Sequence, residues 1–172
     1  MWDWLGEPLA ADFANTTKRR GMVDREFLRS GADLAEWARR QDGRVPLVAD
    51  DVPLEDALAL REAVKRVLHA TVAGSGQPAA AIARLNAMAR AVPLVKQLRS
   101  GRVVLEPAEE VEPLDELLAR VAVSAIELAE ERIGFCDAPS CGQFFARDRA
   151  NQKWCSNHCG TRARVARCAA RG

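Results

Sequence analysis

All five cysteines of the sequence lie in its last 39 residues, and four of them form two pairs. Four residues separate Cys136 from Cys141, thirteen residues follow, and three residues separate Cys155 from Cys159. Two tight turns that each supply two thiolates, joined by a short loop, meet the requirement of a tetrahedral Zn²⁺ site. Gly142 follows the first pair, where a zinc-binding turn often needs a positive φ. The pattern predicts one structural zinc ion with four sulfur ligands.

Two other uses of the cysteines have less support. Disulfides need an oxidising compartment, but no charged-then-apolar signal segment follows Met1, and five cysteines would leave one unpaired. Buried free thiols need apolar neighbours, whereas the residues around these cysteines include Asp137, Ser140, Gln143 and Asn157. We therefore favour zinc over both alternatives.

The residue types leave two candidates for the fourth ligand. His158 follows Cys155 by three residues and could replace Cys159. Adjacent residues at a helix start point about 100° apart, so only one of the two can face the ion. Cys168 lies too far along the same stretch to reach it, and we expect Cys168 to be a free thiol.

A longer pattern surrounds the cysteines. It consists of Phe135, Cys136, Cys141, Phe145, Asp148, Arg149, Asn151, Trp154-Cys155-Ser156 and Cys159-Gly160-Thr161-Arg162. In these residues the region resembles the CGNR zinc finger of bacterial stress-induced transcription regulators, in which Asn is usual at the position of Thr161. Asp12-Phe13-Ala14-Asn15-Thr16 and the leucine-rich stretch 60–69 are similar to that family's N-terminal ABATE-type domain. The resemblance implies DNA-binding transcription regulation in response to stress, and it selects Cys159 rather than His158 as the ligand.

The net charge of +1 hides an uneven distribution. Residues 134–172, which we call the finger, contain seven basic and two acidic side chains, whereas residues 1–133, which we call the body, contain 18 and 22. An acidic body with a basic end is common where a sensor is joined to a nucleic-acid contact, although solvated helix ends can also be basic. Because no apolar run has the length of a membrane span, we expect a cytoplasmic protein.

The body is predicted to be a small helical domain with a minor β element, so that the fold class is mainly α. Four helices are expected at 31–41, 53–73, 78–92 and 113–132. Ser30 and Asp33 have the spacing of a capping box before the first of them. Residues 102–105 are the best strand candidate, with a partner expected in 9–13.

The helix expected at 53–73 has two distinct faces. One face is apolar and consists of Ala57, Leu60, Val64, Val67, Leu68 and Val72. The other face is charged and consists of Glu55, Asp56, Arg61, Glu62, Lys65 and Arg66. His69 lies near the boundary, where we expect a packing residue rather than a ligand or a base.

Two features concern the contact between body and finger. The family likeness would place Asn15 and Thr16 in a pocket, but we favour a turn in which they satisfy their own backbone. Gly134 is the one hinge before the finger, and it is short, so the finger should be held close to the body.

The finger is too small to bury a stable core of its own, so the metal must stabilise it. We expect a knuckle, then a hairpin with Ala150 and Asn151 near its turn, then a helix from Ser156 with Cys155 and Cys159 near its first turn. This order predicts a treble-clef-like zinc finger.

The expected final helix carries candidate DNA contacts. A stripe within about 60° on the helical wheel would meet successive phosphates and consists of Arg164, Arg167 and Arg171, with Lys153 beside it. Polar residues at the helix start could instead read base edges, although helix starts are often polar: Asn157, His158 and Thr161. Arg162 points nearly the opposite way and is expected to pack back and meet a carboxylate such as Asp148.

Three functions are consistent with these features. The leading one is a transcription regulator whose body senses or dimerises and whose finger binds double-stranded DNA. The second is an interaction module in which zinc completes the fold and the arginines meet an acidic protein. An enzyme is disfavoured, because His69 and His158 are the only histidines and a four-thiolate zinc has no open position. The sequence leaves open a small-molecule ligand in the body, a homodimer and the operator sequence.

Overall fold

The computed structural model describes residues 6–20 and 23–170, and Arg171 lies outside them. Its elements follow in the order α1 (Leu9–Ala14), β1 (Thr17–Arg20), β2 (Val23–Glu26), α2 (Gly31–Arg39), α3 (Glu55–Ala73), α4 (Ala79–Ala91), β3 (Leu94–Arg99), β4 (Arg102–Pro107), α5 (Pro113–Leu128), β5 (Ile133–Cys136), β6 (Gln143–Ala146) and α6 (Asn157–Ala169). The fold is mostly helical, and the strands form three antiparallel hairpins, β1–β2, β3–β4 and β5–β6. The predicted fold class is confirmed. None of the described helices is long and apolar enough to cross a membrane.

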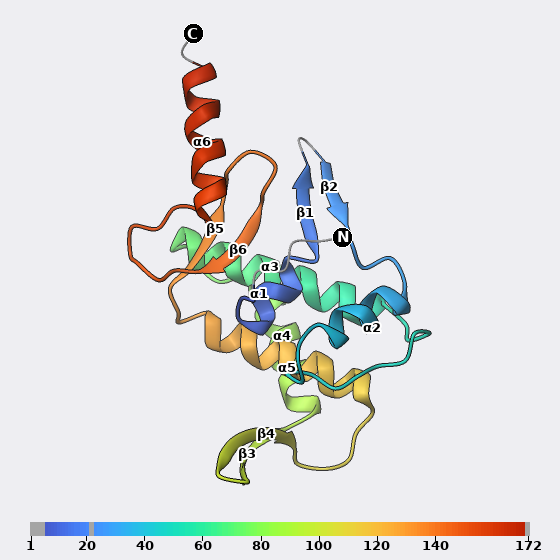
Figure 1. Cartoon of the computed structure of the whole chain (residues 1–172). Coiled ribbons are helices and arrows are strands. Elements are labelled where there is room, and N and C mark those ends of the chain that lie inside the picture. The colour runs from blue at the N-terminus through green and yellow to red at the C-terminus, as the bar shows by residue number, and fades with distance from the viewer. Residues whose placement is uncertain (1–5, 21–22, 171–172) are drawn as a thin grey trace.

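Helix α5 is at the centre of the body, where it packs on α1, α3 and α4 (Figure 1). Ala119, Ala122 and Ala125 on this helix are fully buried, and their small side chains allow the neighbouring helices to approach closely. The expected helix from 113 to 132 ends at Leu128 instead. The body core is therefore built around one alanine-rich helix.

The N-cap predicted for α2 is confirmed, and the helix expected at 53–73 exists as α3 but begins at Glu55. Ser30 caps α2 by accepting a hydrogen bond from the Asp33 amide at 3.3 Å. Helix α3 ends at Ala73 because Gly74 adopts the left-handed conformation, with φ of 61°. The apolar face expected for α3 points into the core, with Val72 partly buried at its end.

The placement of Arg61 on the solvent face of α3 was wrong. Its side chain is 4% exposed, and its guanidinium group donates to Glu26 Oε1 at 2.7 Å and to Thr16 Oγ1 at 3.0 Å. The β1–β2 hairpin covers this side of α3, and Glu26 brings the carboxylate that a buried guanidinium group requires. The sequence patterns did not predict this hairpin, so they did not predict what covers Arg61.

The strand expected at 102–105 exists, but its expected partner was wrong. It extends to Pro107 and pairs antiparallel with Leu94–Arg99, with Arg99 opposite Arg102. Ser100 and Gly101 have φ of 48° and 77° and close the hairpin in two residues, so local pairing costs little closure entropy. The expected partner, 9–13, belongs to the buried helix α1, and a short, mostly apolar run does not distinguish a helix from a strand.

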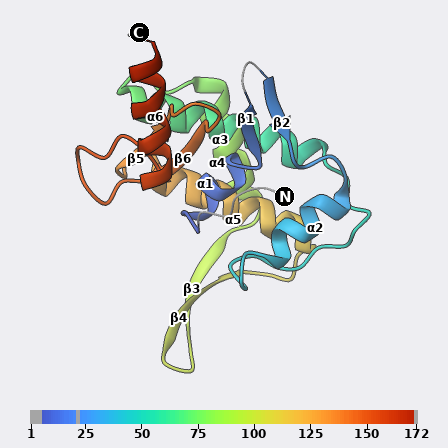
Figure 2. The same cartoon turned by 45° about the horizontal axis from the view of Figure 1, so that its top comes forward.

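The β5–β6 hairpin of the finger lies against the body. It contacts α1 and α3, and both Ile133 and Phe144 belong to the main core. Gly134 is not a hinge but a residue of β5, where it lies opposite Phe145 of β6. A Cβ atom at this position would lie 2.5 Å from the Phe145 ring, which explains the glycine. Helix α6 and the β1–β2 hairpin project on one side of the molecule, and β3–β4 projects at the opposite end (Figures 1 and 2).

Candidate metal centre

The four paired cysteines meet in one cluster. Cys136 ends β5, Cys141 lies in the turn before β6, Cys155 precedes the N-cap of α6, and Cys159 lies in its first turn. Their sulfur atoms all lie within 4.8 Å of one another, with 3.7 Å from Cys141 Sγ to Cys155 Sγ and 3.5 Å from Cys155 Sγ to Cys159 Sγ. A tetrahedron of sulfur atoms around Zn²⁺ has edges of about 3.8 Å. The cluster therefore fits one zinc ion.

Local backbone structure holds the ligands in place. Gly142 has φ of 71°, as its position predicted, and its amide donates to the carbonyl oxygen of Cys136 at 2.9 Å. Ser156 caps α6, since its hydroxyl accepts a hydrogen bond from the Cys159 amide at 3.2 Å. A turn and a helix start thus present the two pairs to each other across the 147–156 loop.

The charge of the cluster also suits a divalent cation. Hydrogen bonds from Cys141 and Cys155 lower the pKa of Cys136 to about 2. The same hydrogen bonds keep protons on the donors, so that the pKa of Cys141 is raised to about 12 and that of Cys155 is also raised. Zn²⁺ would displace the remaining protons and stabilise four thiolates.

Two family models match the chain. Residues 7–131 match ABATE, described as "Putative stress-induced transcription regulator", and residues 132–172 match the CGNR zinc finger. The chain belongs to the ABATE family. The four-cysteine cluster is accordingly the site of one zinc ion in the CGNR finger. No curated protein matches the sequence closely enough to be compared with it.

The rival ligand His158 and the fifth cysteine, Cys168, lie apart from the cluster. His158 is exposed and is not among the residues that could hold the ion, and Cys168 is an exposed free thiol.

Metal analysis of purified protein should therefore give about one zinc per chain, lost in Cys136→Ser or Cys155→Ser and kept in Cys168→Ser. Loss of the metal in Cys168→Ser together with its retention in Cys159→Ser would show that the ligand set is wrong.

Arg162, the last residue of the CGNR motif, packs back as expected but on a different partner. Its Nη2 atom donates to Cys159 Sγ at 3.0 Å, whereas Asp148, the carboxylate we expected, is exposed. Partial burial opposes the charge of Arg162, but the hydrogen bond to Cys159 and the negative sulfur cluster raise its pKa. Zn²⁺ with four thiolates carries a net charge of −2, which attracts a guanidinium group more strongly than one solvated carboxylate does.

Asn15 of the ABATE domain connects the body to the finger through hydrogen bonds. Its side chain is buried, and Nδ2 donates to Phe144 O at 2.9 Å while Oδ1 accepts from Phe144 N at 2.8 Å. The turn interpretation was therefore wrong for Asn15. It holds for Thr16, whose hydroxyl donates to Phe13 O at 2.7 Å. An amide directly after the apolar residues Phe13 and Ala14 was the signal that could have indicated a distant partner.

Glu7 forms a second polar contact between the body and the finger. Its Oε2 atom accepts a hydrogen bond from the Ala146 amide at 2.7 Å, and its own amide donates to Asp12 Oδ1 at 3.1 Å. Burial raises the pKa of Glu7 to about 7 and that of Asp12 to about 6, although Arg44 contacts Asp12 at 3.1 Å. Both ends of strand β6 are thus tied to the body by polar contacts.

Within the CGNR finger, one expected position was wrong. Ala150 and Asn151 lie in the loop between β6 and α6 rather than at a hairpin turn. The hairpin closes earlier, through residues 137–142, because the metal-binding turn itself joins β5 to β6. Trp154 packs against the cysteine cluster from this loop, and α6 follows with the last ligand, as expected.

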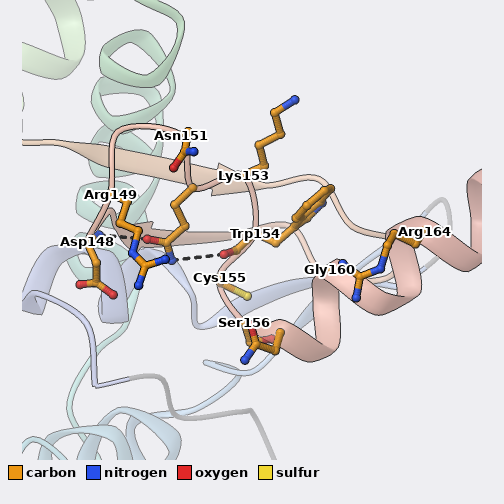
Figure 3. Close-up of a pocket in the computed structure, with 11 residues that line it drawn as sticks. Asp148, Arg149, Asn151, Lys153, Trp154, Cys155, Ser156, Gly160 and Arg164 are labelled. Atoms are coloured by element: carbon orange, nitrogen blue, oxygen red, sulfur yellow. Dashed lines mark hydrogen bonds between the residues drawn. The ribbon is translucent and has the colours of Figure 1, made fainter.

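Of the candidate DNA contacts, Arg171 is outside the described residues, and the others lie around α6. Arg164, Arg167, Asn157, His158 and Lys153 are all exposed. The Arg167 guanidinium group lies over the Trp154 ring at 5.8 Å, and Arg164 Nη2 donates to Thr161 Oγ1 at 3.0 Å. A pocket of about 650 Å³ beside the helix start is lined by Arg149, Lys153 and Arg164 together with polar loop residues (Figure 3).

Proposed function

We propose that the protein is a DNA-binding transcription regulator in which the CGNR finger contacts double-stranded DNA and the ABATE domain senses a signal or dimerises. The observation that carries this proposal is the exposure of α6. Every residue from Arg164 to Ala169 is exposed, and the helix projects away from the body (Figure 1). A helix of these dimensions fits the major groove of B-form DNA.

The side chains around α6 suit two kinds of contact. Phosphates would be met by the basic residues Lys153, Arg164, Arg167 and Arg171, which give affinity without sequence information. Base edges would be met by Asn157 and His158, which are exposed in the first turn of α6. Thr161 would act indirectly, because its hydroxyl group accepts the hydrogen bond that orients Arg164.

The zinc ion has a structural role in this proposal. Four sulfur ligands complete its coordination, so no position remains for a substrate or an activated water molecule. Its contribution is to hold the start of α6 against the β5–β6 hairpin, through Cys159 and Cys155 on one side and Cys136 and Cys141 on the other. The ion thereby orients the helix that would enter the groove.

A salt titration of duplex binding tests the proposal. The wild-type slope of log affinity against log salt should be about −3 or steeper, because each neutralised phosphate contributes about 0.9. The double variant Arg164→Gln/Arg167→Gln should flatten this slope by about 1.8 and weaken binding to all sequences similarly. Asn157→Ala should instead change sequence preference and leave the slope nearly unchanged.

The β3–β4 hairpin offers a matched control. Lys96 and Arg102 are exposed there, at the end of the molecule opposite α6 (Figures 1 and 2). Lys96→Gln/Arg102→Gln removes the same charge and should keep the wild-type slope. A flat salt dependence of the wild type, or no duplex binding at low salt, would contradict the proposal and favour a zinc-stabilised module that binds an acidic protein.

A further inference from the structure

The β1–β2 hairpin is a basic element on an acidic body. Residues 17–26 contain four basic side chains and two acidic ones, so the rest of the body has 14 basic and 20 acidic side chains. One of the two acids, Glu26, is already neutralised by the buried Arg61, with 2.7 Å between Oε1 and Nη1. The hairpin segment is therefore net positive, whereas the rest of the body is net negative.

The base of the hairpin is fixed to the body. Thr16 Oγ1 and Glu26 both accept hydrogen bonds from Arg61, and the Phe27 amide donates to Thr16 O at 3.0 Å. The described outer residues of β2 are exposed, including Val23, Asp24 and Arg25. Because the base is anchored, the hairpin is held in place before any partner binds. Little conformational entropy of the hairpin would then be lost on binding.

The hairpin also lies beside the zinc finger. Thr17 at its base and Asp24 in its outer part line a cavity of about 90 Å³ together with His69 of α3 and with Phe135 and Gly142 of the finger. Gly142 belongs to the zinc-binding turn. Both cartoon views show β1–β2 and α6 projecting from the same side of α3, and β3–β4 projecting elsewhere (Figures 1 and 2). The basic hairpin and the basic helix thus share one face.

We propose that the β1–β2 hairpin is a second DNA-contacting element, which meets the phosphates of the same duplex that α6 binds. The inference rests on the proposed function and adds a contact from the ABATE domain to it. Duplex DNA is the partner that fits, because its regularly spaced phosphates can meet two separate basic elements on one face, and because this face continues the surface proposed for α6. In this arrangement both the body and the finger contact the duplex and position it.

The test compares Arg19→Gln/Arg20→Gln with the distal control Lys96→Gln/Arg102→Gln in the full-length, zinc-loaded protein. Both variants lose two positive charges, but only the first loses them from β1. Relative to the wild type, the hairpin variant should flatten the salt slope by about 1.8 and the control should leave it unchanged. Far-UV circular dichroism and zinc content should match the wild type in both variants.

Two outcomes would overturn the inference, and they can be told apart. If the hairpin variant keeps the wild-type slope while Arg164→Gln/Arg167→Gln loses part of it, α6 binds DNA and the hairpin does not. If the wild type shows no salt-dependent duplex binding, the proposed function fails and the hairpin contact fails with it. Equal flattening by the hairpin variant and the distal control would indicate a general charge effect and would also overturn the inference.

Discussion

Replacing Phe144 with alanine should lower the free energy of unfolding of the whole protein by about 3–5 kcal/mol. Phe144 is 2% exposed and belongs to the core of the body, although it lies in the finger's strand β6. Its ring lies 4.7 Å from that of His69 and 5.1 Å from that of Phe135, so its removal opens a cavity between α3 and the finger. Chemical denaturation followed by far-UV circular dichroism would measure the change.

The neighbouring residue Phe145 is the matched control. It is equally buried, at 1% exposed, but it points to the other side of β6 and packs with the cysteine cluster. Phe145→Ala should therefore accelerate zinc release to a chelator and change the main unfolding transition of the body less than Phe144→Ala does. A larger shift of that transition in Phe145→Ala would contradict this division of the core.

Removal of zinc should free α6 while most of the helical signal remains. The apparent binding free energy of zinc in small finger peptides is about 10–16 kcal/mol, so the loss of the ion should unfold the small cluster that depends on it. The body core instead rests on α1, α3, α4 and α5, whose buried side chains do not include the four cysteines. Limited proteolysis after chelation should cut within 147–170 and leave a resistant body fragment.

Two readouts decide this prediction. Far-UV circular dichroism should keep most of its helical intensity after chelation, and readdition of Zn²⁺ should restore protease resistance. Collapse of the helical signal on chelation would show that the metal cluster and the body core unfold as one unit. Such a result would mean that the contacts of Asn15 and Phe144 transmit the loss of the ion into the body.

Local chemistry made the zinc site and the main helices predictable. The spacing of Cys136, Cys141, Cys155 and Cys159 determines which sulfur atoms can meet, and Gly74 ends α3 by a conformation that its own backbone allows. Each of these features depends on residues close together in sequence. The pattern within a short window was enough to predict them.

Two of the errors involve partners far apart in the sequence. Arg61 is buried because Glu26, 35 residues away, covers it with a carboxylate, and Asn15 bonds to Phe144, 129 residues away. Helical periodicity assigns a face to a residue but does not reveal which element covers that face. The error for Arg162 had another cause. Its partner Cys159 is only three residues away, but the negative charge that attracts the guanidinium group arises only where the four cysteines meet.

Recovery of bound fragments from sheared genomic DNA of the source organism tests the central claim most directly. The wild-type protein and an Arg164→Ala/Arg167→Ala/Arg171→Ala variant would be compared at equal zinc content and at physiological salt. We expect the wild type to enrich a limited set of fragments that share a sequence, and the variant to lose that enrichment. No enrichment by the wild type, or the same fragments recovered by both proteins, would contradict DNA recognition through α6.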